Sequence, residues 1–211
     1  MRSVPPFFTG HRVDCGLYEN GAGMKRTFLL AALACLAMPQ LVGAQETIEE
    51  KAQVCSACHG DNGIPTDPMV PIIWGQHAGY LYLQLKDFKA KKRTNDMMDP
   101  VVETLEKKDL LALATYFESK PWPKTGYVAS KEDRAIGARV AIAGTCPACH
   151  NDQFTGDSSI PRVAGQTPDY LERILIAFKG EMRANNPGMS DIIMTFPDDD
   201  LKAMARFLAG L

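Results

Sequence analysis

The pentapeptide Cys-x-x-Cys-His occurs twice in this chain, at residues 55–59 and 146–150, and no other feature constrains the fold as much. Two thiols at this spacing can form thioethers with the two vinyl groups of one porphyrin, and the next residue places an imidazole beneath the iron. Zinc sites and thioredoxin-like redox pairs also use Cys-x-x-Cys, but the adjacent histidine and the duplication favour haem. We therefore predict two covalently bound haem c groups. The predicted attachment residues are Cys55, Cys58, Cys146 and Cys149, and the predicted axial histidines are His59 and His150.

The two motifs belong to an internal repeat whose matched positions lie 90 or 91 residues apart. Matched pairs include Cys55 with Cys146, Pro71 with Pro161, Tyr80 with Tyr170, Phe88 with Phe178, Arg93 with Arg183, and Leu110 with Leu201. The repeat predicts two tandem domains, residues 45–120 and 130–211, joined by a short stiff linker over residues 121–129. Because each copy has only roughly 80 residues, the haem must supply much of the apolar interior. We expect neither half to fold stably without it.

The N-terminal region has the composition of a leader. A basic start at residues 24–27, an apolar run over 28–38 and small residues ending at Ala44 predict a signal peptide over residues 24–44. The apolar run is shorter than the roughly 20 residues that a membrane-spanning helix needs. Residues 1–23 are interpreted as an upstream extension from a misassigned start codon, with a genuine but cleaved leader as the alternative. The other two cysteines, Cys15 and Cys35, precede the predicted cleavage point, so the mature protein is predicted to be periplasmic and without disulfides.

Helix signals dominate the rest of the sequence and predict an all-α fold. Thr47-Ile48-Glu49-Glu50 is a capping box that opens a helix running into the first motif, and residues 130–133 are predicted to do the same before the second. Thr167 followed by Pro168 predicts a capped helix start. Terminal helices are expected over residues 109–118 and 198–208. The predicted fold class is therefore all-α, with two tandem domains that each surround one covalently bound haem.

Each iron needs a second axial ligand, and the repeat selects a methionine in each copy. Met98 and Met189 both lie 39 residues after their motif histidine (98 − 59 and 189 − 150). A thioether ligand stabilises reduced iron and raises its potential, as suits an electron carrier. Met97 and Met194 remain competing candidates, because methionine is also a common core residue and this chain contains ten.

Two further positions bear on the histidine ligands. Pro71 and Pro161 follow their motif histidines by 12 and 11 residues, and their carbonyls are predicted to accept the Nδ1 proton of the ligand. The alternative is that both are ordinary loop prolines. His77 is the one further histidine after residue 44, and its repeat counterpart is Thr167. We interpret it as solvated or helix-capping rather than as a second ligand to the first iron.

The charge balance excludes one class of partner. From residue 45 onward the chain has 19 Lys or Arg and 23 Asp or Glu, a formal charge of −4 (19 − 23). This mildly acidic and evenly spread balance argues against nucleic-acid binding.

With these residues, the chain resembles the cytochrome c4 family of dihaem periplasmic electron carriers. The resemblance implies a fold of two tandem class I cytochrome c domains, each wrapped around one haem. The resemblance covers residues 47–211 and includes the two haem motifs, the Pro-x-x-x-Gly-Gln segments, the Tyr-Leu helices and the segments at Arg93 and Arg183 before each methionine. It implies His and Met ligation at both irons, haems facing each other across a domain interface, and peripheral attachment to the inner membrane in some members. It also implies redox protein partners: a quinol-oxidising complex or dehydrogenase upstream, and a terminal oxidase downstream.

The predicted function is electron transfer in a respiratory chain without a small-molecule substrate. A low-spin iron with both axial positions filled has no open site, so such a centre passes electrons and does little else. Two alternatives remain open. One is a dihaem redox enzyme of the peroxidase or thiosulfate-oxidising type, which needs one labile or absent methionine ligand. The other is a haem subunit of a larger dehydrogenase complex.

Overall fold

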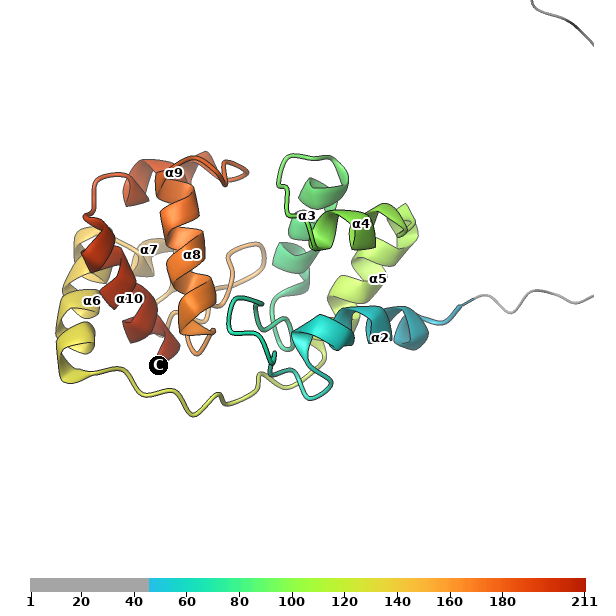
Figure 1. The fold of residues 1–211 in the computed structure, drawn as a ribbon, viewed down its shortest axis with the longest axis horizontal. Coiled ribbons are helices and arrows are strands. Elements are labelled where there is room, and N and C mark those ends of the chain that lie inside the picture. The colour runs from blue at the N-terminus through green and yellow to red at the C-terminus, as the bar shows by residue number, and fades with distance from the viewer. Residues whose placement is uncertain (1–45) are drawn as a thin grey trace, which may run out of the picture. The chain divides into compact units, whose positions relative to one another are not determined.

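Residues 46–211 are described by the computed structural model, and their regular structure is helical (Figure 1). Within these residues the β-type pairing is confined to an isolated antiparallel bridge between Asp157 and Ile160. The all-α prediction is confirmed. The predicted upstream extension, signal peptide, Cys15 and Cys35 lie outside the described residues.

The first half contains four helices. They are α2 (Ile48–His59), α3 (Ala78–Lys89), α4 (Met98–Glu103) and α5 (Lys107–Glu118). The terminal helix α5 packs against both α2 and α3. Their contact surfaces form a core of five buried residues: Ala52, Leu81, Leu113, Ala114 and Phe117. A smaller cluster around Phe88 and Val102 lies under α4.

The second half repeats this arrangement with one extra helix. Its elements are α6 (Lys131–Ala143), α7 (Pro147–His150), α8 (Pro168–Lys179), α9 (Pro187–Ile193) and α10 (Asp198–Ala209). The terminal helix α10 packs against α6 and α8, as α5 packs against α2 and α3. The chain between the halves has no helix over residues 121–130, the region where the sequence predicts a linker.

The predicted helix starts are mostly confirmed. At α2 the Thr47 hydroxyl accepts from the Glu50 amide (3.2 Å) and the Glu50 carboxylate accepts from the Thr47 amide (2.8 Å). At α6 the Ser130 hydroxyl accepts from the Asp133 amide. The prediction for Thr167 is wrong in one respect: its side chain does not cap α8 but donates to the Val70 carbonyl of the first half (3.4 Å).

The helix before the second motif differs from its prediction. The sequence predicts one helix running into Cys146, yet α6 ends at Ala143 and the motif lies on the separate turn α7. Thr145 is in the left-handed region (φ 52°), its amide donates to the Ile142 carbonyl, and the Cys146 amide donates to the Ala141 carbonyl (both 3.0 Å). These two bonds form a Schellman motif, which satisfies the last carbonyls of α6 and ends it.

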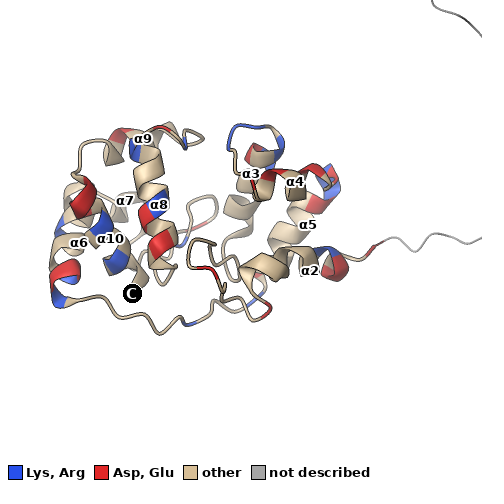
Figure 2. Cartoon of the chain, viewed as in Figure 1, with Lys and Arg blue, Asp and Glu red and all other residues tan. Residues whose placement is uncertain are grey.

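Acidic and basic residues are interspersed along the described helices of both halves (Figure 2). Among residues 46–211, no helix combines the length and apolarity that a membrane crossing requires.

Candidate haem sites

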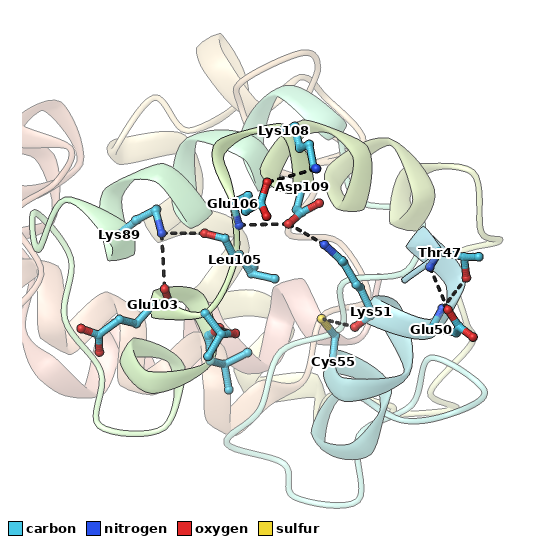
Figure 3. A network of polar contacts seen from close by, with 12 residues as sticks. Thr47, Glu50, Lys51, Cys55, Lys89, Glu103, Leu105, Glu106, Lys108 and Asp109 are labelled. Carbon is cyan, nitrogen blue, oxygen red and sulfur yellow. Dashed lines mark hydrogen bonds and ion pairs between the residues drawn. The ribbon is translucent and has the colours of Figure 1, made fainter. Parts of the chain in front are cut away.

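The first motif occupies the last turns of α2. Cys55 is half-buried and packs against the first core, whereas Cys58 is exposed. The Cys55 Sγ lies 3.9 Å from the Lys51 carbonyl oxygen, one turn earlier (Figure 3). Burial raises the pKa of the Cys55 thiol to about 11, so the free residue is a protonated thiol.

The second motif repeats this inward and outward arrangement. Cys146 precedes α7, is half-buried and packs against the second core, whereas Cys149 is exposed. Burial also raises the pKa of the Cys146 thiol. In both halves the first cysteine is therefore fixed by packing, while the second lies at the surface beside it.

The two motif histidines occupy equivalent environments. His59 is 6% exposed and His150 is 8% exposed. Nδ1 of His59 lies 2.7 Å from the Pro71 carbonyl oxygen, and Nδ1 of His150 lies 2.9 Å from that of Pro161. A carbonyl only accepts, so Nδ1 carries the proton and Nε2 keeps the lone pair that a metal needs. Burial lowers the pKa of both imidazoles, which favours this neutral form.

Each proline segment is tied to the terminal helix of its own half by a glycine. The Gly75 amide donates to the Phe117 carbonyl (2.8 Å), and the Gly165 amide donates to the Leu208 carbonyl (2.9 Å). Both glycines have positive φ, 66° and 72°. A Cβ at Gly75 would lie 2.8 Å from the Trp122 backbone nitrogen, so neither the dihedral nor the space admits a side chain.

The two methionines selected by the repeat lie at equivalent helix starts. Met98 is the first residue of α4 and Met189 belongs to the first turn of α9. The Met98 amide donates to Oδ1 of Asn95 (3.0 Å), and the Met189 amide donates to Oδ1 of Asn186 (3.3 Å). Both methionines are half-buried against apolar clusters.

The competing methionines are more accessible. Met97 is 71% exposed and Met194 is 51% exposed. Because a thioether ligand must lie inside the apolar pocket of its haem, these exposures favour Met98 and Met189 over their neighbours.

His77 occupies the N-cap position of α3, but its side chain is neither solvated nor helix-capping. It is half-buried, its side chain makes no capping bond to α3, and its Nε2 lies 2.8 Å from the Thr155 carbonyl oxygen of the second half. The ring therefore joins the two halves.

Sequence reasoning missed a set of reciprocal contacts between the halves. Arg93 donates to the Tyr170 hydroxyl (3.4 Å), and its repeat counterpart Arg183 donates to the Tyr80 hydroxyl (3.3 Å). Both arginines also donate to Oε1 of Gln84. Burial by itself raises the pKa of Tyr170, but Arg93 and Arg183 outweigh it and lower this pKa to about 8. The signal that could have indicated these contacts was the matching of Tyr80 with Tyr170 and of Arg93 with Arg183 in the repeat.

Each half thus provides the donor set of one c-type haem: a cysteine pair, a neutral imidazole with Nε2 free to coordinate, and a half-buried thioether. The chemistry of these donors fits a low-spin iron with two protein ligands.

Comparisons with known proteins agree with this chemistry. No protein-family model matches the chain. Cytochrome c4 of Thiocapsa roseopersicina is 34% identical over 188 residues, which cover 83% of this chain and 96% of that protein. The thiosulfate dehydrogenase electron acceptor of Stutzerimonas stutzeri (strain A1501) is 31% identical over 195 residues, which cover 87% and 90%. The solved structure of Acidithiobacillus ferrooxidans cytochrome c4 aligns with a TM-score of 0.68 and 30% identity, covering 76% of this chain and 99% of that one.

Proposed function

Because this chain belongs to the cytochrome c4 family and is a dihaem electron-transfer cytochrome, we propose that each half ligates its iron with the histidine and methionine of its own repeat. The proposed ligands are His59 and Met98 in the first half and His150 and Met189 in the second. Cys55, Cys58, Cys146 and Cys149 are the proposed thioether residues. The matched carbonyl contacts of His59 and His150 are the observation that carries this assignment.

The proposed domains are residues 45–120 and 130–211, with residues 121–129 as the linker. The absence of helix over residues 121–130 of the described chain supports this division. We also propose that residues 24–44 are removed as a signal peptide and that the mature protein works in the periplasm, where c-type haem is attached.

When bound, each haem supplies a one-electron iron couple. The protein's part is to keep its surroundings constant while the charge changes. Pro71 and Pro161 hold the imidazole rings in one orientation and one tautomer, and buried packing limits water around them. Asn95 and Asn186 fix the backbone from which each methionine side chain starts. A site held in this way needs little rearrangement on electron transfer.

The proposed place of this carrier is a respiratory chain, between a quinol-oxidising complex or dehydrogenase and a terminal oxidase. The interspersed charges of both halves (Figure 2) support weak docking, because a carrier must dissociate quickly after each transfer. Peripheral association with the inner membrane belongs to the same proposal.

A second candidate role is electron acceptor of a dedicated dehydrogenase. It is supported by the relative of Stutzerimonas stutzeri that is named as the electron acceptor of a thiosulfate dehydrogenase. The two roles differ in the donor, and both use the chain as a carrier. Mixing the oxidised protein with each kind of donor in a stopped-flow spectrometer separates them, since only the true donor reduces it within milliseconds.

The ligand assignment is tested by near-infrared magnetic circular dichroism of the oxidised, haem-loaded protein. Two methionine-to-iron charge-transfer bands are expected. Met98→Ala and Met189→Ala should each remove one band, whereas the matched controls Met97→Ala and Met194→Ala should remove none. If a control variant loses a band, the ligand in that half is the neighbouring methionine.

Carbon monoxide binding to the reduced protein tests the enzyme alternative. A carrier with both axial positions filled should not bind it, because no coordination site is open. Binding to one haem of the unmodified protein would instead indicate a catalytic centre of the peroxidase or thiosulfate-oxidising type.

A further inference from the structure

Two buried glutamines, Gln76 and Gln166, each form two hydrogen bonds with the backbone N–H and C=O of one residue in the opposite half. Oε1 of Gln166 accepts from the Ile72 amide (2.7 Å), and its Nε2 donates to the Ile72 carbonyl (3.0 Å). In the reciprocal contact, Oε1 of Gln76 accepts from the Arg162 amide and its Nε2 donates to the Arg162 carbonyl (both 2.9 Å). Each glutamine side chain belongs to a residue that is only 3% exposed. The contacts therefore lie at equivalent repeat positions and away from water.

The orientation of each side-chain amide is fixed by a second donor. Oε1 of Gln166 also accepts from the Thr167 amide, and Oε1 of Gln76 also accepts from the His77 amide (both 3.0 Å). With two N–H donors at Oε1 and a carbonyl at Nε2, a flipped amide would place like groups against each other. The acceptor oxygen thus faces the opposite half permanently.

The peptide group that Gln166 contacts through its nitrogen also accepts, through its carbonyl oxygen, from the first motif histidine. The Ile72 nitrogen and the Pro71 carbonyl belong to a single planar peptide group. That carbonyl oxygen lies 2.7 Å from Nδ1 of His59. One peptide therefore lies between the imidazole of the first half and the glutamine of the second.

The second half repeats this arrangement. The Pro161–Arg162 peptide accepts from Nδ1 of His150 (2.9 Å) through its carbonyl and donates to Gln76 through its nitrogen. Each imidazole is thus connected, through one peptide, to a glutamine of the other half.

Such a peptide transmits polarisation. Accepting the N–H of a peptide increases the negative charge on its carbonyl oxygen, and hydrogen bonds in a chain strengthen one another by about 10–30%. A stronger acceptor at Nδ1 makes the imidazole a better donor of electrons to a metal at Nε2. This stabilises the oxidised iron and lowers its reduction potential.

We propose that Gln76 and Gln166 are positioning residues that tune the haem of the opposite half, each through the peptide that accepts the Nδ1 proton of the motif histidine. Gln166 acts on the haem of His59, and Gln76 acts on the haem of His150. The inference rests on the proposed ligation by these two histidines. According to this proposal, the hydrogen bonds between the halves help to set the reduction potentials of both haems.

The test uses the full haem-loaded chain with Gln166→Met and Gln76→Met, which preserve approximate volume and remove the acceptor. Proton NMR during a redox titration follows each haem separately. Gln166→Met is expected to raise the potential of the first haem alone, and Gln76→Met that of the second alone. We expect about a twofold change in the ratio of reduced to oxidised haem, which corresponds to about 18 mV at 59 mV per tenfold.

A second readout is the Nδ1 proton of the motif histidine in the reduced, diamagnetic protein. Its resonance should move upfield for His59 in Gln166→Met and stay in place for His150. Burial keeps the carboxyl of Gln166→Glu protonated, so this variant retains an acceptor oxygen for the Ile72 amide and an O–H donor for the Ile72 carbonyl, and it should restore the His59 resonance. This conservative variant also covers the case in which the methionine variant folds poorly.

Gln84→Met is the matched control, because it removes contacts to Arg93 and Arg183 without touching either peptide. It should leave both Nδ1 resonances unchanged. The proposal is overturned if Gln166→Met shifts neither haem, or shifts both as a general loosening of the interface would. Failure of the ligation itself is recognised separately, by the magnetic circular dichroism of the unmodified protein.

Discussion

The two motif helices carry the same pentapeptide on different backbones. In the first half, α2 continues through Cys55 to His59 and ends at Gly60. In the second half, α6 ends before the motif and α7 begins again after Thr145. Both histidines nevertheless reach the same proline contact, at 2.7 and 2.9 Å. The distance between the imidazole and its carbonyl partner is therefore nearly the same in both halves, although the backbone that carries the histidine differs.

The helices also differ in how they are fixed to the terminal helix of their half. In the first half, Nζ of Lys51 on α2 lies 2.7 Å from Oδ2 of Asp109 on α5 (Figure 3). In the second half, Gly137 on α6 allows the backbone of α10 to approach closely, so that a Cβ there would lie 2.8 Å from the Ala203 carbonyl. The first attachment is a largely buried ion pair, so it is electrostatic. The second half also has two ion pairs between α6 and α10, Asp133–Arg206 (3.5 Å) and Arg139–Asp200 (3.7 Å), but both are longer and more exposed. Its distinguishing attachment is therefore the steric one at Gly137. The halves should therefore respond to different perturbations.

The largest difference between the halves should follow from removing one haem. The paired variants Cys55→Ala/Cys58→Ala and Cys146→Ala/Cys149→Ala each prevent attachment in one half. We expect that half to lose cooperative folding, roughly 5 kcal/mol or more. The first half should lose more helix, because its buried clusters are smaller. Hydrogen exchange measured by mass spectrometry reports each half separately, and native protection in the haem-free half would contradict the expectation.

The next largest effect concerns the steric attachment of α6. An alanine normally stabilises a helix relative to glycine, but the Cβ of Gly137→Ala would lie 2.4 Å from Cβ of Phe207. We expect a loss of about 1–3 kcal/mol, because α6 and α10 must move apart. Urea unfolding monitored by circular dichroism measures it. The exposed neighbour Ala135 supplies the control Ala135→Gly, which reports helix propensity alone, and a stabilised Gly137→Ala would refute the close approach.

Much of the fold was predictable because its signals are local. Thr47 with Glu50 predicts the start of α2, and the pattern of apolar residues predicts the terminal helices to within two residues. The proline contacts followed from the spacing in both repeats. The end of α6 was missed because a helix-compatible pattern continues through Gly144, and a β-branched residue such as Thr145 rarely adopts positive φ.

The contacts between the halves were beyond sequence reasoning for a different reason. Gln76 and Gln166 could be recognised as a repeated feature, but their partners Arg162 and Ile72 lie 86 and 94 residues away. The residues near a buried glutamine in the sequence do not indicate which distant peptide it will bond to. The cross-half contact of His77 was missed on the same grounds.

A smaller effect should appear at the break between α6 and α7. Thr145 is held at φ 52°, where the left-handed conformation costs a residue with a Cβ about 1–2 kcal/mol. We expect Thr145→Gly to stabilise the second half by ~1 kcal/mol, and Thr145→Ala to have an intermediate effect at most. Thermal unfolding of the haem-loaded protein measures the difference. Destabilisation by glycine would mean that the threonine side chain itself supports the turn.

The smallest effect, and the one that separates the halves by pH, involves the electrostatic attachment of α2. The hydrogen bond from Lys51 lowers the pKa of Asp109 below its ordinary value. A carboxylate with a depressed pKa in the folded state stabilises the protein above its unfolded pKa, and this contribution disappears as the pH falls through the folded value. We therefore expect Asp109→Asn to lower stability at neutral pH and to flatten its acid dependence in the first half alone.

The control is Asp200→Asn at the matched repeat position, whose carboxylate lies 3.7 Å from Arg139 at the surface and should matter little. Hydrogen exchange of α2 and α6 between pH 7 and pH 3 distinguishes the variants, and equal acid sensitivity of both helices would show that the Lys51–Asp109 pair is not what makes the halves differ.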